Sequence, residues 1–446
     1  MTNKRLTILF IPMNFLGHLN PMIGFAQNFI PKHRVVFAVS QKSKGQLKQY
    51  GFQEENYEVD DSFFNMDRDK MKEFTDEKKM LENYESPLDH WKRWADDDMF
   101  LNMTKNTNVK VKDVVDRVKP NLVVVDVTFI LPSAVKNYPW INLITPNPNT
   151  ILFDERSPPP GCGKIVSCLP EFCLIITFLL GLPANDPNSW KNYNEEIKLI
   201  LVPMIKKLDD FYVSEGLPKR KVIEWYYHSP YLNIYHYPLE LDYTDLKPNP
   251  PNWIRIDTFM IKPKQEFVVP EKLKNLPGKL IYFSLGSVSS INIELMKRLI
   301  GFLSSSPHRF IVSKGAFGDK YELPDNFWGD NFVPQTAVLK VVDLAIIHGG
   351  NNSLCETFYY GKPMIVMPLF ADQPDNAQRV HEKGFGIRMN PFTCTKEQLL
   401  DAIEQLLNDK HLNNKLKLIA SRSERESKEN KIVEIVEQVV SKSKNN

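Results

Sequence analysis

The chain contains 446 residues, which is more than one hydrophobic core usually organises, so the length predicts two domains. A hydrophobic content of 42% and a charged content of 25% are ordinary for a soluble globular protein. The 56 basic and 54 acidic residues leave a net charge of +2, so the composition gives no reason to expect nucleic acid or an anionic membrane as a partner.

The N-terminal half alternates short apolar runs with longer polar segments. The runs that predict β-strands are Leu6–Pro12, Val35–Ser40, Leu122–Asp126, Ile141–Thr145 and Leu232–Tyr235. This alternation is typical of a parallel sheet with crossover helices. The first run is short and lacks a cleavage-like end, so we interpret it as a strand rather than a signal peptide.

Two polar residues lie where these strands end. His18 follows the first strand in a short loop, and Asp126 closes the strand that begins at Leu122. Ligands of open α/β sheets bind at the carboxyl ends of the strands, so the two side chains could form a His–Asp pair. A lone histidine in such a loop is more often structural than catalytic, and the residues alone leave both interpretations open.

Two segments of the N-terminal half lack the strand pattern. Residues 60–105 are dense in charged and aromatic residues, including Trp91 and Trp94, and predict an exposed helical insertion. Residues 155–189 are rich in proline, glycine and cysteine and then become apolar. Their most apolar window, Phe172–Leu182, is too short to span a bilayer.

A proline-rich stretch separates the two halves and predicts the domain boundary. We expect an N-terminal domain at 1–238, a linker at 239–262 and a second domain at 263–423. Further parallel strands are predicted near Lys279–Ser287 and at Phe310–Ser313, Leu344–Ile347 and Met364–Met367. After residue 424 the chain carries apolar residues at helical spacing, which predicts a C-terminal helix.

The five cysteines match no zinc-binding spacing. Scattered reduced thiols of a cytosolic protein explain Cys162, Cys168, Cys173, Cys355 and Cys394 most simply. We expect Cys355 to be a small apolar packing residue rather than a nucleophile.

The most informative stretch begins directly after the run Leu344–Ile347. It reads His-Gly-Gly-Asn-Asn-Ser from His348 to Ser353 and then enters a predicted helix. A helix N-terminus offers unpaired N–H groups and a partial positive charge, and glycines let a phosphate approach the backbone. Glu356 lies one turn further along, within reach of ribose hydroxyls. Ser353 and Glu356 would alternatively form a capping box for the same helix.

The longer string from Phe332 to Asn376 contains Phe-Val-Pro-Gln, His-Gly-Gly-Asn-Asn-Ser, Gly-Lys-Pro-Met and Pro-Leu-Phe-Ala-Asp-Gln. It resembles the nucleotide-sugar signature of the UDP-glycosyltransferases, the family-1 enzymes with a GT-B fold. Weaker resemblance covers nearly the whole chain, and soluble arthropod members such as those of mites look closest. The resemblance implies an α/β protein with two Rossmann-like doubly wound domains that face each other across a cleft. It also implies that the helix within 424–446 packs back on the N-terminal domain.

The resemblance further implies a role for each residue of the donor site. Phe332 lies where family members carry a tryptophan that stacks on uracil, and it keeps a stacking face but loses the indole. The other implied contacts are Val333 and Gln335 to the uridine, Ser287, His348, Gly350, Asn352 and Ser353 to the diphosphate, Glu356 to the ribose, and Asp372 and Gln373 to the sugar.

The same resemblance places His18 and Asp126 at the family's catalytic positions, as a general base and the acid that orients it. It implies an inverting transferase that needs no metal and no cofactor. We expect UDP-glucose as donor and a small hydroxylated lipophilic acceptor, a flavonoid, phenol or xenobiotic, which suits a detoxifying role. We further expect a cytoplasmic monomer with no membrane anchor. The alternatives are a catalytically inactive nucleotide-sugar-binding or regulatory protein and, less compatible with the complete signature, a nucleotide-sugar epimerase.

Overall fold

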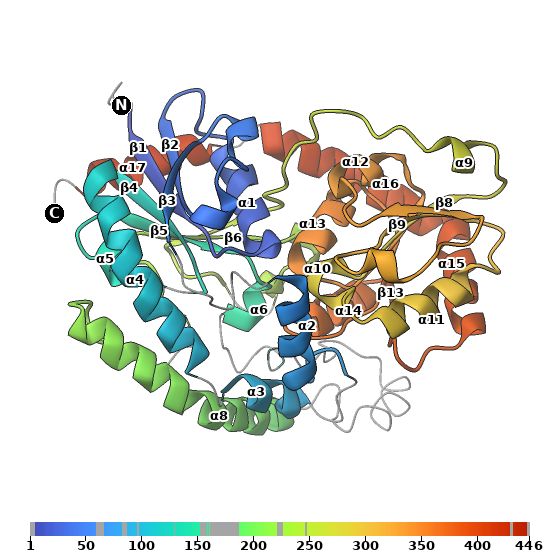
Figure 1. Ribbon diagram of the computed structural model, residues 1–446, viewed down its shortest axis with the longest axis horizontal. Coiled ribbons are helices and arrows are strands. Elements are labelled where there is room, and N and C mark those ends of the chain that lie inside the picture. The colour runs from blue at the N-terminus through green and yellow to red at the C-terminus, as the bar shows by residue number, and fades with distance from the viewer. Residues whose placement is uncertain are drawn as a thin grey trace.

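The computed structural model describes residues 5–58, 67–82, 87–95, 98–128, 130–151, 158, 160, 187–220, 226–245, 248–428 and 431–443. Two parallel β-sheets with flanking helices lie side by side in the molecule (Figure 1). This arrangement confirms the predicted fold class. Residues 161–186, which include most of the segment predicted to be rich in proline and cysteine, lie outside the described residues.

The first sheet has seven strands in the order β3-β2-β1-β4-β5-β6-β7, and all its pairings are parallel. Its central strands are apolar on both faces because helices cover both sides of the sheet. The strands are β1 Thr7–Ile11, β2 Arg34–Ser40, β3 Gln53–Tyr57, β4 Leu122–Asp126, β5 Trp140–Ile144, β6 Leu232–His236 and β7 Trp253–Ile256. The helices of this half are α1 Leu16–Ala26, α2 Arg68–Glu77, α3 Pro87–Ala95, α4 Met99–Val118, α5 Pro132–Val135, α6 Pro148–Ile151 and α8 Pro187–Ser214.

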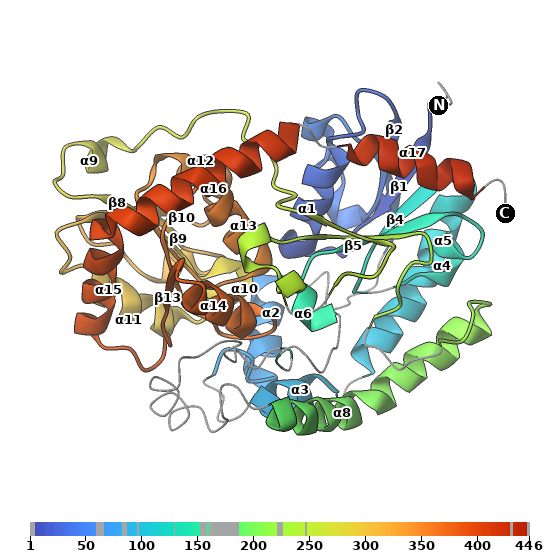
Figure 2. The ribbon, with the colours of Figure 1, turned by 180° about the vertical axis from the view of Figure 1, so that it is seen from behind.

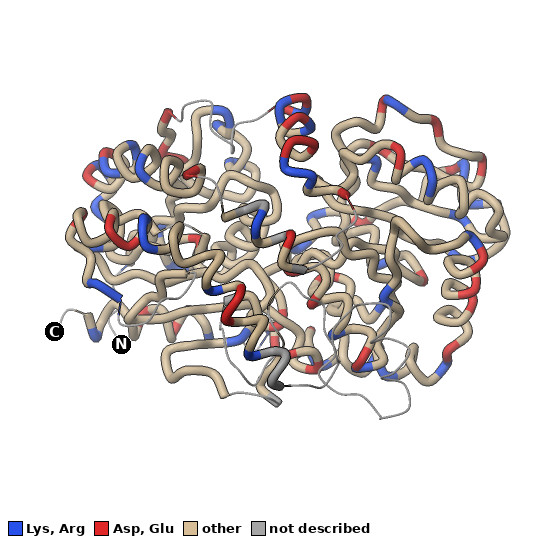
Figure 3. Tube along the Cα trace, turned by 90° about the horizontal axis from the view of Figure 1, so that it is seen from below, with Lys and Arg blue, Asp and Glu red and all other residues tan. Residues whose placement is uncertain are grey.

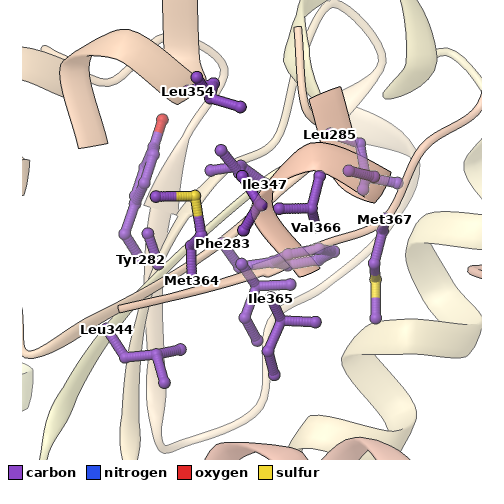
Figure 4. Packing of buried hydrophobic residues seen from close by; sticks show 14 of the residues in the cluster. Tyr282, Phe283, Leu285, Leu344, Ile347, Leu354, Met364, Ile365, Val366 and Met367 are labelled. Atoms are coloured by element: carbon purple, nitrogen blue, oxygen red, sulfur yellow. The ribbon is translucent and has the colours of Figure 1, made fainter. Parts of the chain in front are cut away.

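The second sheet has six parallel strands in the order β10-β9-β8-β11-β12-β13. Side chains of β8, β11 and β12 fill its core (Figure 4). The strands are β8 Leu280–Ser284, β9 Arg309–Ser313, β10 Phe327–Asp330, β11 Leu344–Ile347, β12 Met364–Val366 and β13 Gly386–Arg388. The helices are α9 Glu271–Lys274, α10 Gly286–Ser289, α11 Ile293–Leu303, α12 Gln335–Val341, α13 Asn351–Tyr359, α14 Gln373–Glu382, α15 Lys396–Asn408, α16 Lys410–Lys428 and α17 Ile432–Lys442.

Every strand predicted from an apolar run is present, with ends that differ by no more than a few residues. The sequence analysis missed β3, β7, β10 and β13, and each of these lies at an edge of its sheet. Edge strands pair on one side only and are more exposed, so they need no continuous apolar run. Strand β7 lies inside 239–262, so the first sheet takes up part of the range predicted as a linker.

The prediction of an exposed insertion at residues 60–105 is wrong for the part that contains α2. Phe74, Met80 and Leu81 are buried in the same hydrophobic cluster as the second sheet. Arg68 at the start of α2 reaches across to the second half, where it donates to Asp319 Oδ1 at 3.0 Å and to the Ala316 carbonyl oxygen at 3.2 Å. Helix α2 thus connects the two halves instead of projecting into solvent.

The C-terminal helices return to the first half of the molecule (Figure 2). Helix α17 buries Ile432, Val436 and Val440 in the core of the first sheet. In α16, Arg422 contacts two carboxylates of the N-terminal half, Glu240 at 2.9 Å and Asp257 at 2.8 Å. The chain therefore crosses twice between the two halves.

Lysines and arginines are interspersed with aspartates and glutamates along the described trace in both halves of the molecule (Figure 3). This distribution agrees with the small net charge of +2. Within the described ranges, none of the helices combines the length and apolar character that a membrane crossing requires.

Candidate functional site

A cleft of about 1120 Å³ lies between the two halves, and both contribute to its walls. Parallel sheets place their strand ends, and hence their ligand-binding loops, along such a crevice. All but one of the residues predicted for the site line this cleft, namely His18, Ser287, Phe332, Val333, Gln335, His348, Gly350, Asn352, Ser353, Glu356, Asp372 and Gln373. The exception, Asp126, is completely buried and contacts His18 from behind.

His18 and Asp126 form a hydrogen-bonded pair. The His18 Nδ1 atom lies 2.9 Å from Asp126 Oδ2, and the His18 side chain is 22% exposed. An ionised carboxylate only accepts hydrogen bonds, so Nδ1 carries the proton and Nε2 is the basic nitrogen. The structure therefore brings together the pair expected at the ends of β1 and β4.

Two threonines that the sequence analysis missed complete this pair. Thr128 donates its hydroxyl to Asp126 Oδ1 at 2.5 Å, and its main-chain N–H donates to the same oxygen at 2.9 Å. The Thr145 hydroxyl oxygen lies 2.9 Å from His18 Nδ1. Thr128 lies two residues after β4 and Thr145 directly follows β5, so the strand-end signal that pointed to Asp126 could have found them.

The charge state of His18 depends on competing effects. Burial lowers the pKa of His18, but the charge and hydrogen bond of Asp126, with a further contribution from the charge of Asp372, raise it above its usual 6.5. The Asp126 carboxylate therefore makes His18 a stronger base than a free imidazole.

A junction of glycines holds the His348 ring at the opposite side of the cleft. A Cβ atom at Gly350 would lie 2.5 Å from His348 Nε2, and one at Gly286 would lie 2.6 Å from the same ring. Gly286 also has a φ of +77°, which disfavours any other residue. Burial lowers the pKa of His348 to about 4, so the ring is neutral at physiological pH.

Helix α13 begins at the floor of this junction, and α1 lies opposite it (Figure 1). Its N-cap is Gly350, and no side chain caps its first turn. The alternative interpretation of Ser353 and Glu356 as a capping box is therefore wrong, because the helix starts before Ser353. The uncapped N–H groups and the helix dipole suit an anion in the cleft.

Ser353 and Glu356 instead belong to a polar network with Gln335. The Gln335 Nε2 atom donates to Glu356 Oε2 at 2.5 Å and to Ser353 Oγ at 3.2 Å, and the Tyr282 hydroxyl donates to Gln335 Oε1 at 3.1 Å. Burial raises the pKa of Glu356 to about 7. Phe332, 68% exposed, lies in the same cleft and offers an open aromatic face.

Asp372 and Gln373 are both engaged by main-chain groups. The Asp372 Oδ2 atom accepts from the Asn147 N–H at 2.8 Å, and burial raises the pKa of this carboxyl to about 6. The Gln373 Oε1 atom accepts from the N–H groups of Leu369 and Phe370 at 2.9 and 3.2 Å. Asp372 Oδ1 and the Gln373 amide nitrogen are thus the atoms that these side chains could offer to a ligand.

Two asparagines of the His-Gly-Gly-Asn-Asn-Ser stretch connect the two halves beside the cleft, a role that the sequence analysis did not predict. Asn351 donates to the carbonyl oxygens of Thr145 and His236, at 2.9 and 3.0 Å. Asn352 donates to the Gly17 carbonyl oxygen at 2.6 Å, although the resemblance had implied a role at the diphosphate. Single polar residues at helix starts carry no signal of a partner that is distant in sequence.

The remaining wall of the cleft, on the side of the first sheet, is mainly apolar. Its large side chains are Met13, Phe15, Met71, Phe74, Met80, Trp91, Phe100 and Tyr226. Thr150 lies among them, 9% exposed, and its hydroxyl has no hydrogen-bond partner among the described residues. In the described part of the chain, no group of three or more His, Cys, Asp or Glu side chains could hold a metal ion.

Cys355 has the packing role expected of it. It is 1% exposed in the core of the second half, and burial raises the pKa of its thiol well above the usual value. Such a thiol is a poor nucleophile. Cys394 is also buried, whereas Cys162, Cys168 and Cys173 lie outside the described residues.

Comparison with known proteins links this site to one group of enzymes. Residues 271–428 match the family described as UDP-glucoronosyl and UDP-glucosyl transferase. UDP-glucuronosyltransferase 2A2 of Mus musculus is 31% identical over 137 residues, which are 29% of this chain but only 25% of the mouse protein. NDP-glycosyltransferase YjiC of Bacillus licheniformis is 23% identical over 418 residues, which cover 92% of this chain and 91% of the bacterial protein.

Among solved structures, the glycotransferase of kitacinnamycin superposes with a TM-score of 0.68 at 17% sequence identity, covering 98% of this chain and 100% of that one. At this identity the superposition supports the two-domain fold alone. The expected closeness to soluble arthropod members stays a prediction.

Proposed function

We propose, because the chain belongs to the family-1 UDP-glycosyltransferases, that the protein moves a sugar from a UDP-sugar to a hydroxyl group of a small lipophilic acceptor. One observation carries the proposal: His18 with Asp126 lies on one side of the cleft, and the uncapped N-terminus of α13 begins on the other. A base and an anion-binding helix end that share one cleft are what a direct displacement on a nucleotide sugar requires.

The proposed reaction is one displacement with inversion. His18 Nε2 removes the proton of the acceptor hydroxyl as its oxygen forms a bond to the anomeric carbon. The bond from that carbon to the β-phosphate oxygen breaks, and its electron pair leaves with UDP. Asp126 keeps the proton of His18 on Nδ1 and stabilises the imidazolium that forms. An α-linked donor therefore yields a β-glycoside.

Fixed hydrogen-bond donors would stabilise the leaving diphosphate. The first turn of α13 offers main-chain N–H groups, and the neutral His348 ring lies beside it. Ser287, in the turn after β8, lines the same end of the cleft. Donors that are already oriented stabilise developing charge without reorganisation. In this proposal they make a divalent metal unnecessary.

The charges of the cleft favour glucose over a uronic acid as the transferred sugar. Among the described residues that line it, Lys262 and Lys264 are the only lysines or arginines, and Lys264 donates to the Gln49 carbonyl oxygen. The carboxyl that faces the sugar position is that of the buried Asp372. A second carboxylate beside it would be desolvated without a partner, which is unfavourable. We therefore propose UDP-glucose as donor, with Asp372 and Gln373 binding its hydroxyls.

The apolar wall supports a flat lipophilic acceptor such as a flavonoid, another phenol or a xenobiotic. Aromatic and methionine side chains adapt to planar apolar molecules and supply most of their binding energy. The hydroxyl of Thr150, which has no partner among the described residues, suits a second polar group on the acceptor, because a buried hydroxyl without a partner is unfavourable. A detoxifying role fits acceptors of this kind.

The direct test is UDP release by the purified protein. The assay combines UDP-glucose or UDP-glucuronic acid with a panel of phenols, alcohols and flavonoids, and mass spectrometry identifies the products. Acceptor-dependent release with UDP-glucose and a β-glucoside product are the expected results. Preferential use of UDP-glucuronic acid would overturn the sugar assignment. Binding of UDP-glucose without turnover of any acceptor would instead favour an inactive nucleotide-sugar-binding protein.

A further inference from the structure

Two consecutive residues at the start of α13 hold the main chain on both sides of the proposed base. Asn352 donates its side-chain amide to the carbonyl oxygen of Gly17, the residue directly before His18, at 2.6 Å. Asn351 donates to the carbonyl oxygen of Thr145 at 2.9 Å, and the hydroxyl of Thr145 lies 2.9 Å from His18 Nδ1. The helix that offers its N-terminus to the nucleotide is therefore bonded to both neighbours of the His18 ring.

The Asn351 side-chain amide makes two hydrogen bonds to main-chain oxygens. The second goes to the His236 carbonyl oxygen at 3.0 Å, and Asn351 is 5% exposed. Both acceptors belong to the first half of the molecule, directly after β5 and at the end of β6. Because a buried carbonyl left without a donor costs about 1–3 kcal/mol, these bonds favour one position of α13 relative to β5 and β6.

The Gly17 contact is of a different kind. A Cβ atom added at Gly17 would meet nothing within 4 Å, so this side of Gly17 faces open space. The hydrogen bond from Asn352 is thus a specific restraint on the main chain that leads into His18.

We propose that Asn351 and Asn352 are positioning residues that set the His18 ring in register with the nucleotide-binding end of α13. The inference rests on the proposed function. Both residues act through main-chain atoms around His18, and neither transfers a proton. The first turn of α13 then fixes the distance between His18 and the leaving diphosphate, because its asparagine side chains bond to the other half of the molecule. General-base catalysis depends on such placement, because a shift of about 1 Å can cost about 100-fold in rate.

Acceptors that differ in acidity separate positioning from a general loss of structure. An ionised nitrophenol needs little help from a base, whereas an aliphatic alcohol depends on His18 fully. In Asn351→Ala we expect kcat to fall about 10- to 100-fold with the alcohol and less than threefold with 4-nitrophenol, since a general base contributes about 10²–10⁴ in total. Asn352→Ala should show the same asymmetry with a smaller loss. The dissociation constant of UDP should stay within about twofold in both variants.

Arg68→Ala provides the matched control, because Arg68 also bonds the two halves but touches neither His18 nor its neighbours. It should lower both acceptor rates to the same small extent.

Equal losses with both acceptors in the asparagine variants would overturn the inference and leave the proposed function intact. Weaker UDP binding in Asn352→Ala would show that its amide serves the diphosphate instead. A wild-type protein without transferase activity would overturn the proposed function, and this inference with it. Asn352 is only half-buried, so its variant tests the idea even if Asn351→Ala fails to fold.

Discussion

The two sides of the cleft are built in different ways. On the side of the second sheet, the proposed donor contacts come from turns and helix starts between Ser287 and Gln373, where glycines, a free helix end and a few polar side chains fix the geometry. On the side of the first sheet, apolar side chains from Met13 to Tyr226 form the wall, and α2 contributes to it while it packs on the second half. The donor side must keep one backbone geometry because it binds one nucleotide. The side chains of the apolar wall can vary to suit different acceptors.

The largest expected effect comes from removing the proposed base on the acceptor side. His18→Ala should lower kcat by about two to four orders of magnitude, because general-base catalysis contributes that much. The dissociation constant of UDP should stay within about twofold, since the donor contacts lie on the other side. Single-turnover kinetics together with calorimetric titration of UDP would measure both quantities.

Asp126→Asn is the informative companion to that variant. It keeps the shape of the pair, but its amide no longer stabilises the imidazolium or selects the tautomer with Nε2 as base. Turnover near the wild-type rate in either variant would contradict the dyad and leave the cleft as a binding site only.

A smaller but still large effect is expected on the donor side from Gly350→Ala. The added methyl group would lie 2.5 Å from His348 Nε2, so either the ring or the start of α13 must move. We expect UDP-glucose affinity to fall at least about tenfold, which corresponds to the loss of about one charge-assisted hydrogen bond. Gly301→Ala serves as control, because its Cβ would meet nothing within 4 Å and the residue does not line the cleft. Wild-type affinity in Gly350→Ala would show that the glycine junction has no part in donor binding.

The same contrast explains which strands could be predicted from sequence. Runs such as Leu122–Asp126 and Leu344–Ile347 lie in the interior of a sheet, and burial on both faces requires an apolar sequence that is easy to recognise. Strand β3 reads Gln-Glu-Glu-Asn-Tyr and pairs on one side only, so nothing in its composition distinguishes it from a loop.

The junction from His348 to Glu356 was accessible from sequence because one strand, one turn and one helix set its spacing, whereas the roles of the other donor residues came from the resemblance to the family. Contacts between the halves were not accessible, since Asn351 and Thr145 are separated by 206 positions and meet only after both sheets have formed. For the same reason the apolar residues of α2 were interpreted as part of an exposed insertion. Their partners belong to the second half, and local sequence carries no trace of them.

A moderate effect on the donor side is expected from pH. Burial raises the pKa of Glu356 to about 7, and ribose hydroxyls would bind its ionised form. Donor binding should therefore lower this pKa, so that affinity is full above pH 7 and declines as the pH falls below it. Between pH 8 and pH 6 the dissociation constant of UDP-glucose should rise by about tenfold, because each pH unit below a pKa is worth about 1.4 kcal/mol.

Titration with UDP-glucose rather than UDP avoids the ionisation of a terminal phosphate. Glu356→Gln should bind more weakly at pH 8 and lose most of the pH dependence, which leaves the smaller part contributed by the Asp372 carboxyl with its pKa of about 6. If the variant kept the wild-type dependence, another group would be responsible and Glu356 would serve only the network with Gln335.

The smallest effect on donor binding is expected from Phe332, an exposed side chain on the donor side of the cleft. Phe332 is 68% exposed, and in this proposal it stacks on the uracil through one open face. Phe332→Ala should weaken UDP-glucose binding by about 1 kcal/mol, or about fivefold, the lower end of the usual contribution of base stacking on an aromatic side chain. Phe332→Trp enlarges the stacking face without changing the backbone, so affinity should rise by no more than about fivefold, with kcat unchanged. The uracil ring of the donor would lie far from the anomeric carbon. A change in kcat in the tryptophan variant would therefore mean that residue 332 acts on the acceptor side of the cleft instead.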